Sequence, residues 1–243
     1  MPGEKLTPRE KRRYGKQIMI PEIGIAGQEK LRDASVLVVG AGGLGCPVLI
    51  YLAAAGVGKI GIVEFDVVDE TNLQRQILYS SGDLGKLKSI IAKDRLVDFN
   101  PLITFKVINL KLDKTNSANI LRDYDVIVDA TDNLEARYAI NDACILLNKP
   151  MVHGAIYKFE GQVTVFNYKG GPDYRKYNPE VQGSDSKNPD PADVGLMGVL
   201  PGITGTYMAN EVIKLITETG TILNGKLLIF NILHNSFKIL KIN

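Results

Sequence analysis

Short apolar runs alternate with longer amphipathic stretches along the first two thirds of the chain. The short runs are rich in β-branched residues and predict strands at 35–39, 59–64, 103–110, 125–129 and, as the start of a fifth, 150–153. The longer stretches have helical spacing and predict helices at 44–55, 86–99, 118–123 and 133–147. Strands that alternate with helices of this length pair in parallel. The pattern therefore predicts an α/β fold with a doubly wound, Rossmann-like and mainly parallel sheet.

The two ends of the chain have different patterns. Residues 1–34 are largely polar and predict a helical N-terminal segment. After residue 155, antiparallel strands are expected at 162–167, 226–231 and 237–241, with a helix at about 204–217. The Gly-, Pro- and Asp-rich stretch 170–194 has no period and is interpreted as a flexible crossover loop. We expect one domain over 1–243, divided into the N-terminal segment 1–34, a first half 35–155 and a second half 156–243.

The composition excludes several classes of protein. Of the 243 residues, 45% are apolar and 23% are charged, so a sizeable core is expected and wholesale disorder is not. The formal net charge of +2 is too balanced for a nucleic-acid wrapper or a membrane-surface binder. The stretch from Val36 to Gly58 carries no charge, but its clustered glycines indicate a strand, a turn and a buried helix rather than a membrane span. The N-terminus has no apolar run of the signal-peptide kind.

The two cysteines indicate a cellular compartment. Cys46 and Cys144 each lie in an apolar stretch and are expected to be buried thiols. Two cysteines make neither a disulfide scaffold nor a four-cysteine zinc site. The cysteine content therefore points to a reducing compartment, most simply the cytoplasm.

A glycine-rich loop, Gly40-Ala-Gly42-Gly43-Leu-Gly45, follows the first predicted strand and opens the next helix. Glycines at this spacing permit a tight turn, let a phosphate approach the backbone and let the helix pack closely on the strand. The helix N-terminus also offers free N–H groups to an anion. Glu64 ends the second predicted strand, where a carboxylate can hold ribose hydroxyls, so this region alone suggests a dinucleotide such as NAD. The alternative is that the glycines serve packing only.

Three charged side chains change that interpretation. Arg75, Lys88 and Asp132 are all expected near the carboxyl ends of the strands, around the glycine loop. Two cations and an acid suit a triphosphate with magnesium better than a nicotinamide, because the cations offset phosphate charge and a carboxylate can anchor Mg²⁺. Each residue also has a plainer interpretation. Arg75 would be a surface charge, Lys88 a solvated helix residue and Asp132 a helix N-cap.

The order of the motifs is more specific than any one of them. The glycine loop is followed by E-F-D at 64–66, N-L-Q-R-Q at 72–76, G-x-x-K at 85–88 and T-D-N at 131–133. In this order they resemble the ubiquitin-activating-enzyme superfamily, most closely its bacterial branch that adenylates sulfur-carrier proteins (MoeB, ThiF and HesA). The resemblance covers nearly the whole chain, through the segments 13–18, 161–166, 209–214 and 226–230.

The resemblance implies an activity and a set of site residues. The family binds MgATP and the C-terminal Gly-Gly tail of a ubiquitin-like carrier protein. The carrier carboxylate attacks the α-phosphate and gives an acyl-adenylate and pyrophosphate. The first half of the chain would then bind the nucleotide and the second half the carrier. The residues along the nucleotide would be Gly40, Gly42, Gly43, Gly45, Glu64 (at the ribose), Asp66, Asn72, Gln74 and Asn133.

The resemblance also assigns the charged residues. Arg75 and Lys88 would contact the phosphates, and Asp132 would hold Mg²⁺. The family forms homodimers in which an arginine reaches into the partner's site, and Lys16 stands at that position here. Lysine keeps the charge but lacks the guanidinium fork that grips two oxygens.

The chain departs from the family at its cysteines. Many relatives carry two C-x-x-C pairs that bind structural zinc. Here the position of the first pair reads G-P-D-Y at 171–174, and no second pair follows. No zinc is therefore expected. The loop 170–194 also lacks the cysteine with which some members form a thioester or persulfide, so adenylation without an enzyme thioester is expected. His153, expected to end the fifth strand, and His234, expected in a turn, are interpreted as structural.

Other functions stay open on the sequence. The same fold also adenylates small-molecule, nucleoside or peptide carboxylates. The glycine loop and Glu64 alone would serve an NAD-dependent oxidoreductase. A non-catalytic scaffold would keep the carrier groove and lose the chemistry, although Arg75, Lys88 and Asp132 are all present. Neither a nucleic acid nor a membrane is expected as a partner.

Overall fold

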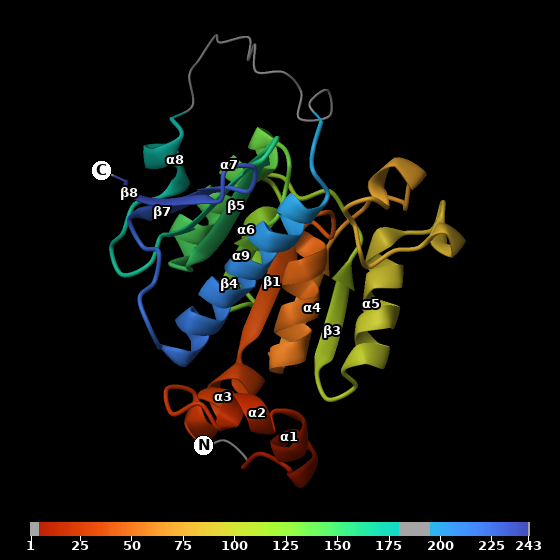
Figure 1. Ribbon diagram of the computed structural model, residues 1–243, viewed down its shortest axis with the longest axis vertical. Helices are drawn as coiled ribbons and strands as arrows, with labels where there is room; N and C mark the ends of the chain where they lie inside the picture. The colour runs from red at the N-terminus through yellow and green to blue at the C-terminus, as the bar shows by residue number, and fades with distance from the viewer. Residues whose placement is uncertain (1–4, 180–194, 243) are drawn as a thin grey trace.

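A single mixed sheet forms the centre of the molecule (Figure 1). The computed structural model describes residues 5–179 and 195–242, and within them the sheet has eight strands in the order β3-β2-β1-β4-β5-β6-β7-β8. Their bounds are β1 Ser35–Val39, β2 Lys59–Val63, β3 Thr104–Ile108, β4 Val126–Asp129, β5 Met151–Tyr157, β6 Glu160–Phe166, β7 Lys226–Asn231 and β8 Ser236–Lys241. Strands β1 to β5 pair in parallel, and β6 to β8 join antiparallel, which confirms the expected fold.

Helices cover both faces of this sheet. Their bounds are α1 Pro8–Arg13, α2 Gly15–Ile18, α3 Gly24–Asp33, α4 Gly45–Ala55, α5 Lys88–Phe99, α6 Ser117–Leu121, α7 Leu134–Leu147, α8 Tyr174–Tyr177 and α9 Val199–Thr217. Two 3₁₀ turns, η1 Glu70–Asn72 and η2 Ser81–Asp83, lie in the connection from β2 to α5. Side chains of α4, α5 and α9 belong to one core, and those of α6, α7 and α8 belong to a second core on the other face. The sheet is therefore doubly wound, as the alternating pattern predicted.

Strand β1 shows how the sequence builds both cores. Alternate side chains of a strand point to opposite faces. Val36 and Val38 accordingly enter the core under α4, α5 and α9, whereas Leu37 and Val39 enter the core under α6 and α7. A run that is apolar at every position is thus typical of a parallel strand covered on both sides.

Strand β5 joins the parallel and antiparallel parts. It pairs in parallel with β4, where His153 lies opposite Asp129, and antiparallel with β6 along its whole length. His153 therefore sits inside the strand, and the expectation that it ends the strand is wrong. The strand continues for four residues beyond it because β6 supplies hydrogen-bond partners out to Tyr157. His234 lies in the turn between β7 and β8, as expected.

Helix α9 begins five residues earlier than the sequence predicted. Pro201 lies in its first turn, where the missing N–H has no helical partner to lose. Gly205 lets the helix approach the N-terminus of α4, because a Cβ at this position would lie 2.4 Å from the Leu44 carbonyl oxygen. Tertiary packing thus outweighs the weak helix propensity of the Gly- and Pro-containing start.

The predicted crossover loop is described in part. Helix α8 occupies residues 174–177, inside the stretch that was expected to lack structure. Asp173 caps it by accepting a hydrogen bond from the Lys176 N–H at 3.0 Å. Residues 180–194 of the predicted loop lie outside the described residues.

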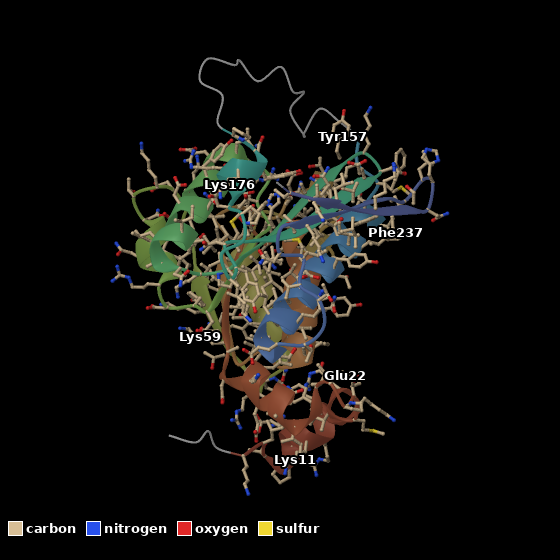
Figure 2. All side chains as sticks on the ribbon, turned by 90° about the vertical axis from the view of Figure 1, so that its left-hand side faces the viewer. Lys11, Glu22, Lys59, Tyr157, Lys176 and Phe237 are labelled. Carbon is tan, nitrogen blue, oxygen red and sulfur yellow. The ribbon has the colours of Figure 1, made fainter. Side chains whose placement is uncertain are left out.

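The N-terminal segment forms the base of the molecule, as Figures 1 and 2 show. Thr7 and Glu10 form a capping box at the start of α1, which confirms a helical segment here. Figure 2 places Lys11 and Glu22 at this base and Tyr157 at the opposite end. Lys16 is exposed on α2 at the base, far from the carboxyl ends of the parallel strands.

No helix among residues 5–179 and 195–242 is long and apolar enough to span a bilayer. The uncharged stretch from Val36 to Gly58 divides into β1, a glycine turn and the buried helix α4, as expected. Both cysteines are fully buried.

Candidate active site

The sheet order reverses between β1 and β4, and a cavity of about 570 Å³ opens at the carboxyl ends of these two strands. Ligands bind at such a switch point because the loops after the two strands turn to opposite faces of the sheet. The predicted site residues that line this cavity are Gly40, Gly42, Gly43, Glu64, Asp66, Asn72, Arg75, Lys88, Asp132 and Asn133. Three other predicted residues, Gly45, Gln74 and Lys16, do not line it.

The glycine loop has the backbone that its sequence predicts. Gly40 has φ +95°, a conformation that residues with a Cβ rarely adopt, and the backbone of Ala130 packs against it. Gly42 and Gly43 face the cavity at the start of α4. Gly45 lies beneath them, where a Cβ would be 2.0 Å from the Gly40 carbonyl oxygen. The role of Gly45 in this structure is therefore close packing of α4 on β1.

We expect Gly45→Ala to destabilise the protein by about 3 kcal/mol, since the added methyl collides with backbone that has no room to move. Gly202→Ala is the matched control. Gly202 also lies in a helix, but a Cβ there would meet nothing within 4 Å. It should be neutral or slightly stabilising because alanine favours the helix. Urea unfolding of both variants measures the difference, and equal midpoints would contradict the packing role of Gly45.

Glu64 braces the glycine loop with its side chain. Its Oε2 accepts a hydrogen bond from the Ala41 N–H at 2.9 Å, and its Oε1 accepts from the N–H groups of Phe65 and Asp66 at 2.8 and 2.9 Å. A carboxylate can accept about four hydrogen bonds, so Oε2 keeps capacity for one more donor. Because Glu64 also lines the cavity, the predicted contact with a ribose hydroxyl is compatible with this bracing.

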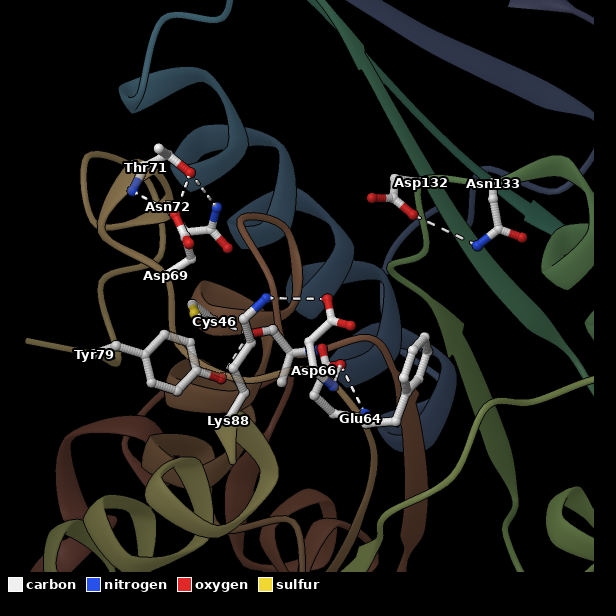
Figure 3. A network of polar contacts seen from close by, with 12 residues as sticks. Cys46, Glu64, Asp66, Asp69, Thr71, Asn72, Tyr79, Lys88, Asp132 and Asn133 are labelled. Carbon is white, nitrogen blue, oxygen red and sulfur yellow. Dashed lines mark hydrogen bonds and ion pairs between the residues drawn. The ribbon is translucent and has the colours of Figure 1, made fainter. Parts of the chain in front are cut away.

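Lys88 is the buried cation of the site. It is the first residue of α5, and its side chain is only 5% exposed. Its Nζ lies 3.2 Å from Asp66 Oδ2, as Figure 3 shows, and Asp66 is about half exposed at the cavity. Burial excludes the plainer interpretation of Lys88 as a solvated helix residue. An anion that entered the cavity would find a desolvated ammonium group held beside the glycine loop.

The loop 72–76 presents one side to the cavity. The N–H groups of Arg75 and Gln76 both donate to the Asn72 carbonyl oxygen at 3.0 Å, so the loop makes a helical turn. Residues three and four apart share a face of such a turn. Asn72, Arg75 and Gln76 therefore line the cavity, and Gln74 points outward against Gly198. The structure places Gln76 where the sequence analysis placed Gln74.

Gln76 and Arg75 reach toward the glycine loop. Gln76 is 5% exposed, and its Nε2 lies 3.4 Å from where a Cβ of Gly42 would be. Its Oε1 is buried and has no hydrogen-bond partner among the described residues. The stem of Arg75 lies over Gly43, and its Nη1 donates to the Thr71 carbonyl oxygen at 3.1 Å. These side chains leave polar groups at the cavity wall for a ligand.

Asp132 carries a nearly free carboxylate. The N-cap of α7 is Asn133, whose Oδ1 accepts from the Ala136 N–H at 2.9 Å, so the plainer interpretation of Asp132 as the cap is wrong. Within the described part of the chain, Asp132 has one weak side-chain contact, with Asn133 Nδ2 at 3.5 Å (Figure 3). Mg²⁺ in nucleotide sites is held by one or two carboxylates, with phosphates and water as its other ligands. An exposed carboxylate in this cavity fits that role.

The sequence did not predict functional roles for Asp129 and Arg137. It also did not predict that His153 pairs with Asp129. Asp129 ends β4, and its Oδ2 lies 2.7 Å from His153 Nδ1, with both side chains buried. Arg137 lines the cavity from α7, and its Nε lies 3.9 Å from the same Oδ2. A cation near the N-terminus of a helix opposes the helix dipole. The unfavourable position of Arg137 near the start of α7 was therefore the only hint in the sequence that it has an anionic partner.

Burial controls the charge of the histidine. It lowers the pKa of His153 below 6.5, and the hydrogen bond to Asp129 opposes this shift without overcoming it. Burial alone would raise the pKa of Asp129, but the hydrogen bond from His153 and the charge of Arg137 hold it below its usual value. At neutral pH the pair is thus a carboxylate and a neutral imidazole that donates through Nδ1–H. This supports the structural interpretation of His153.

The pair predicts an acid-dependent loss of stability. As the pH falls through 6.5, the unfolded chain takes up a proton at His153 before the folded protein does, so stability decreases downward from there. We expect wild type to lose up to about 1 kcal/mol more than His153→Asn between pH 6.5 and 5.5. Denaturant titrations of both proteins at the two pH values measure this. Parallel losses would contradict the assignment of a neutral buried histidine.

Neither thiol is available for covalent chemistry. Burial raises the pKa of Cys46 to about 12, and its Sγ donates to the Ala41 carbonyl oxygen at 3.4 Å (Figure 3). Burial also raises the pKa of Cys144. A nucleophilic cysteine needs a lowered pKa and access to solvent. The two described cysteines have neither property.

The comparisons with known proteins decide the family. The family model described as "ThiF family" matches residues 14–243. The chain belongs to the ThiF family. This confirms the resemblance that the order of the motifs indicated.

Curated ThiF relatives are similar over nearly all of this chain. A "Probable molybdopterin-synthase adenylyltransferase" of Porphyra purpurea is 46% identical over 230 residues, covering 95% of this chain and 60% of the relative. A "Sulfur carrier protein adenylyltransferase" of Thermus thermophilus is 46% identical over 237 residues, covering 96% and 87%. A "Probable adenylyltransferase/sulfurtransferase MoeZ" of Mycobacterium tuberculosis is 44% identical over 246 residues, covering 99% and 62%. The chain thus spans about three fifths of the first and third of these ThiF relatives.

Solved structures share the ThiF fold of this chain. Escherichia coli MccB with MccA-N7isoASN superposes with a TM-score of 0.85 at 22% identity, covering 96% of this chain and 72% of MccB. PaaA superposes with a TM-score of 0.83 at 21% identity, covering all of this chain and 76% of PaaA. The parallel half and the antiparallel half therefore recur together in one architecture.

Proposed function

We propose that this ThiF protein is an ATP-dependent adenylyltransferase for the C-terminal glycine carboxylate of a ubiquitin-like sulfur-carrier protein. The observation that carries the proposal is the arrangement around the glycine loop. Arg75 and Lys88 lie on the side of β2 and α5, and Asp132 lies after β4, all at one cavity. The names of the relatives in Porphyra purpurea and Thermus thermophilus support an adenylyl transfer to a sulfur carrier.

In this proposal the chain acts by positioning and by charge. The glycine loop and the N-terminus of α4 receive the phosphates, with Arg75 and Lys88 offsetting their negative charge. Mg²⁺ bound at Asp132 would neutralise the charge that develops on the phosphates. A carrier carboxylate is already ionised at neutral pH, so no general base is needed. Holding it in line with the α-phosphate supplies most of the remaining rate enhancement.

The burial of both thiols supports a reaction that consists of adenylation alone. Carrier adenylate and pyrophosphate would be the products, and no bond to an enzyme cysteine would form. Sulfur transfer would then belong to another protein or domain. The proposal places the chain in the cytoplasm, without structural zinc.

A homodimer is part of the same proposal. Lys16 lies on α2 at the base of the molecule, whereas the cavity opens at the carboxyl ends of β1 and β4. It therefore cannot serve its own cavity, and a second copy would have to bring it there. Sedimentation combined with Lys16→Ala kinetics tests this, since a monomer with unchanged kinetics would contradict it.

ATP–pyrophosphate exchange tests the proposed function. It is measured with and without candidate carriers that end in Gly-Gly. Exchange that depends on a carrier would establish the reaction and identify the partner. Exchange that depends on a small molecule or a peptide carboxylate would overturn the carrier assignment. Binding of NAD without binding of ATP would overturn the whole proposal in favour of an oxidoreductase.

A further inference from the structure

Thr131, the residue before Asp132, has a hydrogen-bond partner for each of its polar groups. Thr131 donates to Asp129 Oδ1 through its N–H at 3.1 Å and through its Oγ1 at 2.6 Å. Its carbonyl oxygen accepts a hydrogen bond from Arg137 Nη2 at 3.0 Å. The backbone that leads into Asp132 is therefore fixed by two side chains, one from β4 and one from α7.

The residue after Asp132 is fixed as well. Asn133 caps α7 through its side chain, with the Ala136 N–H as donor. Asp132 is thus an exposed carboxylate between two anchored neighbours. Its direction is set by the backbone, because its own oxygens have only the weak contact with Asn133 in the described part of the chain.

His153 completes the support from the neighbouring strand. Its Nδ1 lies 2.7 Å from the Asp129 oxygen that Thr131 does not use, so both oxygens of this fully buried carboxylate are satisfied. The Tyr174 ring of α8 lies 5.0 Å from the imidazole ring, and the Phe166 ring lies 5.7 Å from it. These rings keep water away, so a lost hydrogen bond there could not be replaced by solvent.

We propose that Asp129, Arg137 and His153 form a positioning network that aims Asp132 at the metal ion of the nucleotide. The inference rests on the proposed function, because it assumes that Asp132 binds Mg²⁺. A fully buried carboxylate such as that of Asp129 is costly, and well-packed apolar residues would stabilise a fold equally well or better. The network therefore makes sense as a device that orients the carboxylate. Side chains behind metal ligands affect metal affinity about 10–100-fold in other proteins.

The experiment measures the Mg²⁺ concentration at half-maximal ATP–pyrophosphate exchange. His153→Leu removes the donor to Asp129, and we expect it to raise this concentration about tenfold. His153→Asn places an amide N–H where Nδ1 stood, so it should remain within about twofold of wild type. Arg137→Lys keeps the charge but loses the geometry of the Thr131 contact, and we expect a rise of about tenfold.

Thermal unfolding and two further variants separate the outcomes. His234→Leu, in the exposed turn between β7 and β8, is the matched histidine control and should leave the Mg²⁺ dependence unchanged. If Arg137→Lys and His153→Leu lower the melting temperature without changing the Mg²⁺ dependence, the network is merely structural and the inference is overturned. Asp132→Asn must raise the Mg²⁺ requirement. If it does not, the metal role of Asp132 itself fails, which is a different result.

Discussion

Asp132→Ala is expected to reduce ATP–pyrophosphate exchange by about 10³-fold while the protein stays folded. The expected loss is large because the proposed metal ligand is a single carboxylate, and electrostatic contacts at a reacting phosphate contribute about 10²–10³-fold each. The fold should tolerate the change, since Asp132 is exposed and Asn133, rather than Asp132, caps α7. Exchange assays at saturating ATP, with circular dichroism as a check on folding, measure both properties.

Asp94→Ala is a matched control for this result. Asp94 is an exposed aspartate on α5, outside the cavity lining. Its removal should leave the rate of exchange unchanged. It should change the free energy of unfolding by no more than about 0.5 kcal/mol. Normal exchange in Asp132→Ala would contradict the metal role of Asp132.

Lys88→Met is expected to reduce exchange by about 10²-fold, with most of the loss in the rate at saturating ATP. Lys88 is held desolvated next to the glycine loop, where a charge acts more strongly on a phosphate than it would in water. Methionine matches the length of the stem and fills the buried space, so packing should be kept. The Asp66 carboxylate that loses its partner is half exposed and can be solvated.

The neighbouring lysine offers the control. Lys86 lies two residues earlier and is exposed, with its Nζ donating to the Gly82 carbonyl oxygen at 2.8 Å. Lys86→Met should therefore leave exchange within about twofold of wild type. Equal losses in both variants would mean that general surface charge, and not the buried position of Lys88, accounts for the effect.

The sequence predicted the parallel half closely because its signals are local. The run at 35–39 is apolar from Val36 to Val39 and is followed by the glycine loop, and β1 has the same bounds. Helix α9 was predicted too short, because its first residues form a helix only through contact with α4. Helix α8 was missed for a similar reason. Tyr174 is buried against Phe166 and His153, which come from distant strands.

The order of the motifs predicted the residues around the glycine loop but not the residues behind them. Ten of the predicted residues meet at one cavity, because loops after neighbouring parallel strands converge. Gln74 was placed there instead of Gln76, since the helical turn at 72–76 determines which side chain faces inward. Asp129, Arg137 and His153 were not found as a group. Their contacts link two strands and a helix, and no spacing in the sequence encodes them.

The position of α9 has a consequence for synthesis of the chain on the ribosome. This helix packs on α4 and contributes Leu200, Met208 and Val212 to the core on that face of the parallel strands. It is made more than forty residues after β5 is complete, as the bounds of the two elements show. Until then the face of α4 that contacts α9 has no cover, and exposed apolar surface promotes aggregation. The parallel half therefore cannot complete this core until α9 has been synthesised.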